Sequence, residues 1–451
     1  MYYLLKDKLG IDKAILFTLL GRGLQIGTAL FTVVFIARYL SPEEQGFYYT
    51  FGSIVAIQVF FELGLTQIIT QFVAHEFSHL KIEEDLSVIG DDKYLSRLSS
   101  LLHFCGKWYL VFAFFLALGL VIAGVWFFNY YEKENVGIIW ELPWVILAIG
   151  TALNFLLSPI IAFIEGLGKV KEVAQIRLVQ LVIDPIVIWG GLAIGSKLFV
   201  SGADAICRVI VVAVILFKSP FYKILKNIWK SQKDERVSYL EEIFPYQWRI
   251  ALSWISGYFI FQLFNPVLFA VEGAKVAGQM GMTLAALNGL QAMTMSWINT
   301  KVPQMSGYIE LRNYAALDDL FYRTKKQMTF VGTMVIVLFV LVIYLLQSYN
   351  IVFLGMRIGD RFLPILPMLG MAWASWTMIP INCWAVYLRC HKKEPLLANS
   401  VTVGVLCCIS TIILGNIYGL MGMVIGFALL RFVSLTWIHA VFKEKKILWH
   451  K

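Results

Sequence analysis

The chain has 451 residues, of which 59% are hydrophobic and 15% are charged, and its formal net charge is +9. Soluble globular proteins have about 25% charged residues, so this composition excludes an ordinary soluble domain. The basic balance does not indicate nucleic-acid binding, because Lys and Arg collect in the cytoplasmic loops of membrane proteins. The six cysteines form no CxxC pair and mostly lie in apolar runs, so we expect no disulfide, metal site or cofactor.

Long apolar runs recur along the chain and predict an all-α polytopic membrane protein. Several of them, such as AILFTLLGRGLQIGTALFTVVFIA near the start, approach or exceed the roughly 20 residues that cross a bilayer. Lys and Arg concentrate in the connections on one side, which predicts a multi-pass protein with both termini in the cytoplasm. The predicted spans are about twelve, at 14–37, 47–72, 107–129, 143–164, 177–195, 203–217, 247–270, 279–299, 328–346, 363–388, 395–415 and 420–440.

A long basic connection divides these spans six and six. We expect an N-terminal lobe at 1–217, a basic cytoplasmic amphipathic connector at 218–246 and a C-terminal lobe at 247–451. An apolar stripe that includes Phe221 and Ile228 lies beside lysines of the connector, which predicts a segment on the membrane surface. The basic turns GLGKVKEVAQ and LRCHKKEPLLA echo each other and favour two parallel repeats around a central cavity.

Five charged residues inside the predicted spans share one layer, about 10–15 Å from the inner ends of their helices. They are Arg22, Glu62, Asp184, Arg208 and Arg431. Charges at such depth normally face a bundle interior or a watery cavity. Three arginines against two acids leave excess positive charge, which favours an anionic substrate, and guanidinium groups bind phosphate through two oxygens. The alternative is that Arg22–Glu62 and Asp184–Arg208 are interhelical ion pairs that serve the fold.

Amides and aromatic residues follow helical spacing on the faces of three spans. The expected substrate-binding set combines them with the arginines: Arg22, Gln25, Arg208, Arg431, Trp254, Tyr258, Gln262, Asn288 and Gln291. Trp254 and Tyr258 offer faces for sugar stacking, although packing is the more common role of aromatic residues in membrane helices. Glu62 and Asp184 are predicted to serve in ion coupling or in ion pairs.

The segments ARYLSPEEQGFYYTFGSI and FELGLTQIITQFVAHE resemble the first two spans of polysaccharide exporters. These are the Wzx-type O-antigen flippases of the multidrug/oligosaccharidyl-lipid/polysaccharide (MOP) superfamily. The resemblance implies two six-helix lobes around a cationic cavity, which flip undecaprenyl-diphosphate-linked oligosaccharide from the inner to the outer leaflet by alternating access. It implies that Arg22 serves the diphosphate and that Glu62 is the acid of the second-span motif.

The same resemblance implies the bacterial inner membrane, a role in surface polysaccharide or lipopolysaccharide biosynthesis, and no enzymatic activity. The partners it implies are the lipid-linked oligosaccharide, membrane lipids, and a glycan polymerase and ligase of the same pathway. Coupling to H⁺ or Na⁺ stays open. A MATE-like cation-coupled antiporter of small molecules is the first alternative, and it would favour acids over arginines in the cavity. A membrane-bound polymerase or acyltransferase is less favoured, because no large outer loop is present. A membrane scaffold without transport activity is the last alternative, and such a protein would not need a layer of polar residues inside its spans.

Overall fold

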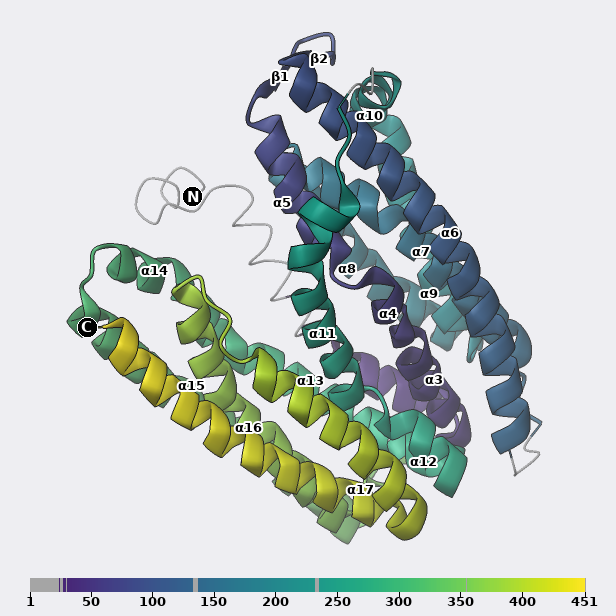
Figure 1. Ribbon diagram of the computed structural model, residues 1–451. Helices are drawn as coiled ribbons and strands as arrows, with labels where there is room; N and C mark the ends of the chain where they lie inside the picture. Colours follow the sequence, from purple (N-terminus) through teal and green to yellow (C-terminus); the bar gives the residue numbers. More distant parts are fainter. Residues whose placement is uncertain are drawn as a thin grey trace, which may run out of the picture. The chain divides into compact units, whose positions relative to one another are not determined.

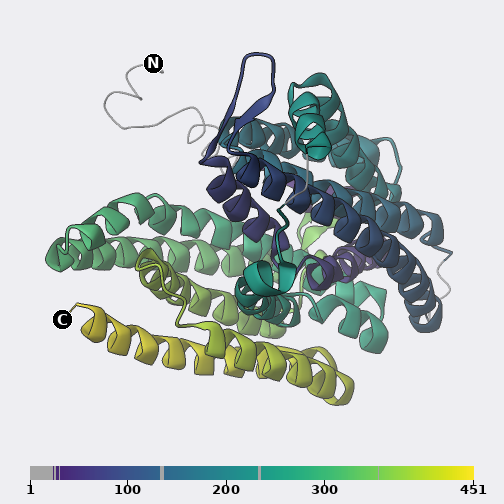
Figure 2. The ribbon, with the colours of Figure 1, turned by 45° about the horizontal axis from the view of Figure 1, so that its top comes forward.

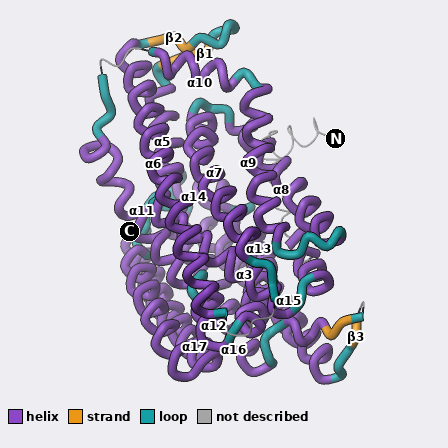
Figure 3. The backbone as a smooth tube through the Cα atoms, turned by 90° about the vertical axis from the view of Figure 1, so that its right-hand side faces the viewer, coloured by secondary structure: helices purple, strands orange, loops and turns teal. Residues whose placement is uncertain are grey.

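The computed structural model describes Leu24 and residues 27–29, 31–132, 137–231, 235–353 and 355–450 (Figure 1). This part of the chain is helical almost throughout, as Figure 3 shows, with strands only in two short antiparallel hairpins. They are β1 (Leu80–Ile82) with β2 (Val88–Gly90), and β3 (Val352–Phe353) with β4 (Met356–Arg357). Seven described helices are long and apolar enough to cross a membrane, or eight when one bent pair counts as a span. The predicted all-α membrane fold is confirmed.

The helices group into two compact units, of which the first contains Ile54–Tyr130 and Gly137–Trp254. Its helices are α4 (Val59–Glu62), α5 (Leu65–Phe77), α6 (Asp92–Tyr131), α7 (Glu141–Gly166), α8 (Val170–Ala193), α9 (Phe199–Lys218), α10 (Phe221–Lys230) and the first part of α11 (Phe244–Phe261). A 3₁₀ turn (Ala56–Gln58) precedes α4, and a π-helical turn (Tyr239–Ile243) leads into α11.

Small residues let α7 and α9 approach closely inside this first unit. A Cβ on Gly150 would lie 2.7 Å from the Ala205 methyl group, and a Cβ on Gly202 would lie equally close to the side chain of Ile146. Helix packing in membranes depends on such contacts, because lipid tails supply no hydrophobic drive between helices. The Asn154 amide also donates to the backbone oxygen of Ala205 at 2.8 Å. These contacts fix the rotation of α7, whose polar side chains form part of the site below.

The second unit contains Ala29–Ser53 and Ile255–Lys451. Its helices are α3 (Pro42–Val55), the last part of α11, α12 (Phe264–Glu272), α13 (Ala274–Asn299), α14 (Val302–Glu310), α15 (Tyr314–Ser348), α16 (Ile365–Cys390) and α17 (Leu397–Trp449), with a 3₁₀ turn at Ile358–Arg361. Gly419, at φ 58°, interrupts α17 and divides it into two helices. Because residues 29–53 belong to this unit, the units do not follow the linear boundaries at 217 and 247, and that lobe division stays a prediction.

The connector is docked on the first unit. Three apolar side chains of α10 are buried, and Ile228 among them is fully inaccessible. The Trp229 ring stacks on His103 of α6, with 3.6 Å between the ring centroids. Figure 2 shows α10 next to the β1–β2 hairpin, where Asn227 donates to the backbone oxygen of Leu86. The stripe that the sequence assigned to the membrane surface therefore packs against protein.

Candidate functional site

A polar hollow of about 520 Å³ lies inside the first unit, between α5, α7 and α8. Seven of its lining side chains are neutral hydrogen-bonding groups: Thr66, Gln67, Thr70, Gln71, Asn154, Ser158 and Gln180. Glu62, Glu165 and Arg177 supply its charges, and none of its described lining residues is aromatic. Polar side chains on membrane helices normally face a protein interior or water rather than lipid. This hollow is therefore the candidate functional site.

A break in the second predicted span places Glu62 at this hollow. Glu62 ends α4, and Leu63 and Gly64 both adopt left-handed conformations, with φ of 50° and 69°. The helices on either side of the break are bent by 42°. A Cβ at Gly64 would lie 2.3 Å from Cγ2 of Ile250, so glycine suits both the conformation and the close approach of α11. The backbone conformation and the close contact explain why the FELG motif has a glycine at position 64. The break at this glycine brings Glu62 to the hollow.

The surroundings of Glu62 are neutral in the described part of the chain. Thr66 donates from its hydroxyl to Oε1 of Glu62 at 2.5 Å. Among the described residues, no Lys, Arg or His side chain lies within the 4.0 Å of an ion pair with Glu62. Arg22 and Gln25 lie outside the described residues. The expected pairing of Glu62 with Arg22, and the substrate roles of Arg22 and Gln25, stay predictions.

An ion pair marks one end of the hollow. Arg177 of α8 donates to Oε2 of Glu165, the penultimate residue of α7, at 2.6 Å. The Arg177 side chain is 58% exposed, so the guanidinium remains open to a second anionic group. This arginine was not among the predicted site residues, although it lies just beyond the basic turn GLGKVKEVAQ.

Asp184 and Arg208 meet, as the ion-pair interpretation expects, and a second acid joins them. Nη2 of Arg208 lies 3.1 Å from Asp184 and 2.9 Å from Asp204, one helical turn earlier on α9. Oδ1 of each aspartate is buried and has no hydrogen-bond partner within the described part of the chain. The spacing of Asp204 and Arg208, i to i+4, was the signal for this contact that the sequence analysis overlooked. Asp204 adds a third acid to the two of the predicted layer, so the acids equal its three predicted arginines and the expected positive excess disappears.

Arg431 is enclosed in the second unit rather than open to a cavity. It is 3% exposed, and its guanidinium contacts the sulfur of Met378 and lies over the ring of Phe427. Its Nε has no hydrogen-bond partner among the described residues. In this conformation Arg431 has no access to a substrate, so its predicted binding role requires a rearrangement of α16 and α17.

The remaining predicted binding residues are divided between the units. Trp254 belongs to the first unit and lies beside Gly64, whereas Tyr258, Gln262, Asn288 and Gln291 belong to the second. Tyr258 is buried, Gln262 is half-buried and Asn288 is exposed. Gln291 donates to the hydroxyl of Ser375 on α16 at 3.1 Å. None of these residues lines the polar hollow, and their shared role stays a prediction.

No family model and no curated protein matches this sequence. Solved structures do resemble it. An inward-facing MATE family multidrug resistance transporter of the MOP superfamily aligns with a TM-score of 0.60 and 12% identity, over 93% of this chain and 94% of that one. The lipid II flippase MurJ, in an inward closed conformation, aligns with a TM-score of 0.61 and 13% identity, over 96% of this chain and 89% of that one. An outward-facing MATE family multidrug resistance transporter of the MOP superfamily aligns with a TM-score of 0.50 and 13% identity, over 97% of each chain. The fold is therefore that of MATE and MurJ transporters, with about twelve helices.

Proposed function

We propose that this protein is a flippase for a lipid-linked oligosaccharide in the bacterial inner membrane. Its substrate would be an O-antigen unit or similar surface glycan on undecaprenyl diphosphate, moved from the inner to the outer leaflet by alternating access of the two lobes. The fold is shared with a lipid II flippase as well as with multidrug transporters, so the fold alone does not decide the substrate. The neighbours include transporters and a flippase, which favours transport over enzymatic activity.

The lining of the hollow is the observation that carries this proposal. Drug-sized ligands are bound mostly by hydrophobic and aromatic side chains, with few polar groups. This hollow has five apolar aliphatic lining residues, but it also presents seven amides and hydroxyls from three helices, among them Gln71, Asn154 and Ser158, and its described lining includes no aromatic ring. Such groups match the many hydroxyls of a sugar, because each can donate or accept a hydrogen bond.

The charged part of the substrate needs separate partners. In this proposal Arg177 receives the diphosphate at the inner mouth, where the Glu165 carboxylate holds the guanidinium in place. Arg22 then serves the diphosphate deeper in the membrane, as the resemblance implies. The lipid tail stays in the bilayer while the sugar and diphosphate cross. Glu62, whose described neighbours are neutral, is the candidate for carrying a proton that couples the cycle to an ion gradient.

Purified protein in proteoliposomes with a labelled undecaprenyl-diphosphate oligosaccharide tests the function. We expect the sugar to become accessible to an impermeant glycosidase at a rate well above that of protein-free vesicles. The double variant Gln71→Leu/Ser158→Ala should slow flipping several-fold while the amount of folded protein is unchanged. A matched control is Gln304→Leu, which changes an exposed glutamine of α14 outside the hollow. Flipping that is absent in the wild type would overturn the proposal.

A cation-coupled antiporter is the second candidate, and the Asp184–Arg208–Asp204 cluster favours it. Two acids share one arginine there, so the cluster has spare negative charge for a proton or a metal cation. The same vesicles distinguish the two functions when they are loaded with a fluorescent organic cation under a proton gradient. Cation export without oligosaccharide flipping would establish the antiporter instead.

A further inference from the structure

A second hollow of about 520 Å³ lies in the first unit, where the β1–β2 hairpin and α10 meet the start of α8 and the end of α9. Figure 1 shows the hairpin and α10 at the same end of this unit. Of its lining residues only Ile176 also lines the polar hollow. Its volume falls within the roughly 300–1,000 Å³ of small-molecule sites. The proposed transport function leaves this second hollow without a role.

The lining of the second hollow changes from charged to apolar along α8. Lys169 directly precedes α8 and Glu172 lies in its first turn, whereas Ile176 and Val179 lie one and two turns further on. Gln175 and Ser219 are the other polar lining residues, and the remaining eight are apolar. A ligand that fits this lining therefore has a charged end and an apolar end.

The two charges of the second hollow are available to a ligand. Lys169 and Glu172 are both half-buried, and among the described residues neither has an ion-pair partner within 4.0 Å. Their spacing of three residues puts them close together at the start of α8. An anion alone would face the Glu172 carboxylate, and a cation alone would face the Lys169 ammonium. Only a ligand with one charge of each sign complements both.

Exposed aromatic residues beside the second hollow place it at the level of lipid headgroups. Phe217 and Tyr222 are exposed, with 5.8 Å between their ring centroids, and Lys226 lies over the Tyr222 ring. Amphipathic aromatic rings and long cationic side chains are typical of the membrane–water interface. On α8, Val182 and Ile186 are exposed beyond the hollow, where acyl chains would lie.

We propose that the second hollow binds the headgroup of phosphatidylethanolamine from the inner leaflet. The Lys169 ammonium donates to the phosphate, and the Glu172 carboxylate accepts from the primary ammonium of the lipid. Val179 and Phe221 contact the glycerol and the first part of the acyl chains. The inner leaflet follows from the predicted cytoplasmic position of the β1–β2 hairpin.

Phosphatidylglycerol is the alternative occupant. The exposed lysines of α10, such as Lys223 and Lys226, attract anionic lipids to this part of the membrane surface. Its headgroup has no ammonium, however, so it offers no cation to Glu172. The site does not depend on the proposed transport function, because the bound lipid is a component of the bilayer and occupies a different hollow.

Lipid titrations of the delipidated full-length protein in detergent, followed by native mass spectrometry, test the site. The probes are phosphatidylethanolamine, phosphatidylcholine and phosphatidylglycerol with identical acyl chains. The wild type should bind phosphatidylethanolamine about tenfold more tightly than the other two, because the quaternary ammonium of phosphatidylcholine cannot donate a hydrogen bond. Glu172→Gln should abolish this preference, and Lys169→Gln should weaken the binding of all three lipids. The matched control is Glu310→Gln/Lys326→Gln, which removes two exposed charges of the second unit and should keep the preference.

A second substitution tests the position of the site by shape. Val179→Trp would fill the hollow from its apolar side and should weaken all three lipids without loss of folded protein, because Val179 is partly exposed. Phosphatidylethanolamine should also raise the unfolding temperature of the wild type more than that of Val179→Trp. Three results would each overturn the proposal: equal binding of the three lipids by the wild type, tighter binding of phosphatidylglycerol, or an undiminished preference in Glu172→Gln.

Discussion

At the scale of single residues, Gly64 shows why a short motif can be recognised before its structure is known. It combines a left-handed backbone with the close approach of Ile250 from α11. Its neighbour Leu63 also has a positive φ, a backbone conformation that residues other than glycine rarely adopt. The two residues together end α4 at Glu62, so the position of that carboxylate depends on the break.

Gly64→Ala should therefore destabilise the protein. A left-handed conformation costs a non-glycine residue about 1–2 kcal/mol, and the added Cβ would lie 2.3 Å from the Ile250 side chain, so the total loss should be larger. The unfolding temperature of the detergent-solubilised protein measures the effect. Gly52→Ala in α3, where a Cβ meets nothing within 4 Å, is the matched control and should be neutral or slightly stabilising. Equal unfolding temperatures for the two variants would contradict this explanation.

Glu62→Gln should separate coupling from binding. The amide oxygen can still accept from Thr66, so we expect normal folding, but the side chain can no longer release or take up a proton. Flipping in vesicles should lose its response to an imposed proton gradient. Glu165→Gln, at the other end of the hollow, should keep that response. A Glu62→Gln protein that still accelerates with the gradient would rule out Glu62 as the coupling group.

Two substitutions of Arg22 distinguish the role of its positive charge from the role of its side-chain shape. Arg22→Lys keeps the charge and should retain partial function, whereas Arg22→Ala should retain little, because a neutral side chain cannot bind the diphosphate. Flipping and the amount of folded protein are measured together. Normal flipping by a well-expressed Arg22→Ala protein would refute the substrate role, and loss of folded protein would support the ion-pair alternative.

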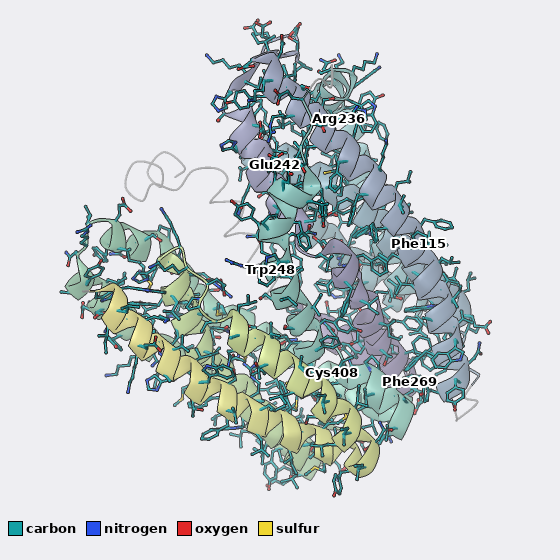
Figure 4. The ribbon with its side chains drawn as sticks, in the orientation of Figure 1. Phe115, Arg236, Glu242, Trp248, Phe269 and Cys408 are labelled. Carbon is teal, nitrogen blue, oxygen red and sulfur yellow. The ribbon has the colours of Figure 1, made fainter. Side chains whose placement is uncertain are left out.

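At the scale of helices, the connector is held to the first unit by polar contacts around one arginine. Arg97 of α6 lies 3.1 Å from the buried Glu76 of α5 and 2.5 Å from Glu242 in the π-helical turn before α11. Ser96, the preceding residue, accepts from the backbone of Glu235 at 2.9 Å. Figure 4 labels Arg236 and Glu242, which both belong to this segment. These contacts attach the connector to α6, so it does not hang as a free tether.

Arg97→Ala should release this segment. Glu76, only 3% exposed, would lose its partner, and breaking a buried ion pair from one side costs about 3–5 kcal/mol. Limited proteolysis should then cut the connector faster than in the wild type, and the unfolding temperature should fall. Arg323→Ala is the control, because its ion pair with Asp319 is mostly exposed and such pairs contribute about 0–1 kcal/mol. An unchanged proteolysis rate would show that the hydrophobic contacts of α10 suffice.

The acidic cluster between α8 and α9 leads to a similar prediction, and a second substitution within the same cluster should restore part of the lost stability. Arg208→Ala leaves Asp184 and Asp204 facing each other without a cation, so the unfolding temperature should fall. Adding Asp204→Asn removes one negative charge and should recover part of the loss. Arg177→Ala, at an exposed pair with Glu165, should have a small effect by comparison. Failure of the double variant to recover would mean that repulsion is not the cause.

At the scale of the whole molecule, the open question is which side of the membrane each connection faces. The bias of Lys and Arg predicts that both termini are cytoplasmic, so the β1–β2 hairpin should lie inside and the connection after α15 outside. In a cysteine-free background, Tyr349→Cys should react with an impermeant maleimide on intact cells. Glu84→Cys should react only after permeabilisation. Both side chains are exposed, so the reverse pattern would contradict the predicted orientation.

The sequence by itself determined the membrane class and the helical fold, but not the break at Glu62, because residues 47–72 were expected to form one span. The membrane class and the helical fold depend on local properties, namely the length of apolar runs and the charges at their ends. They hold whichever way the helices rotate against one another. The expectation of an all-helical membrane fold could therefore be made before any contact was known, whereas the MOP-like arrangement was implied only by the resemblance of the first two spans to that superfamily.

Only the tertiary structure decided which side chains meet. Asp204 joins the Asp184–Arg208 pair, Arg431 is enclosed against Met378, and His391 approaches His450 across 59 residues of sequence. Each depends on how one helix is rotated against another, and small residues at the contact determine this through close packing, as Gly150 and Gly202 do between α7 and α9. A residue count along one helix gives depth in the membrane but not the facing partner. For that reason the sequence predicted five charges in one layer, which stays a prediction, and left out Asp204, which contacts Arg208.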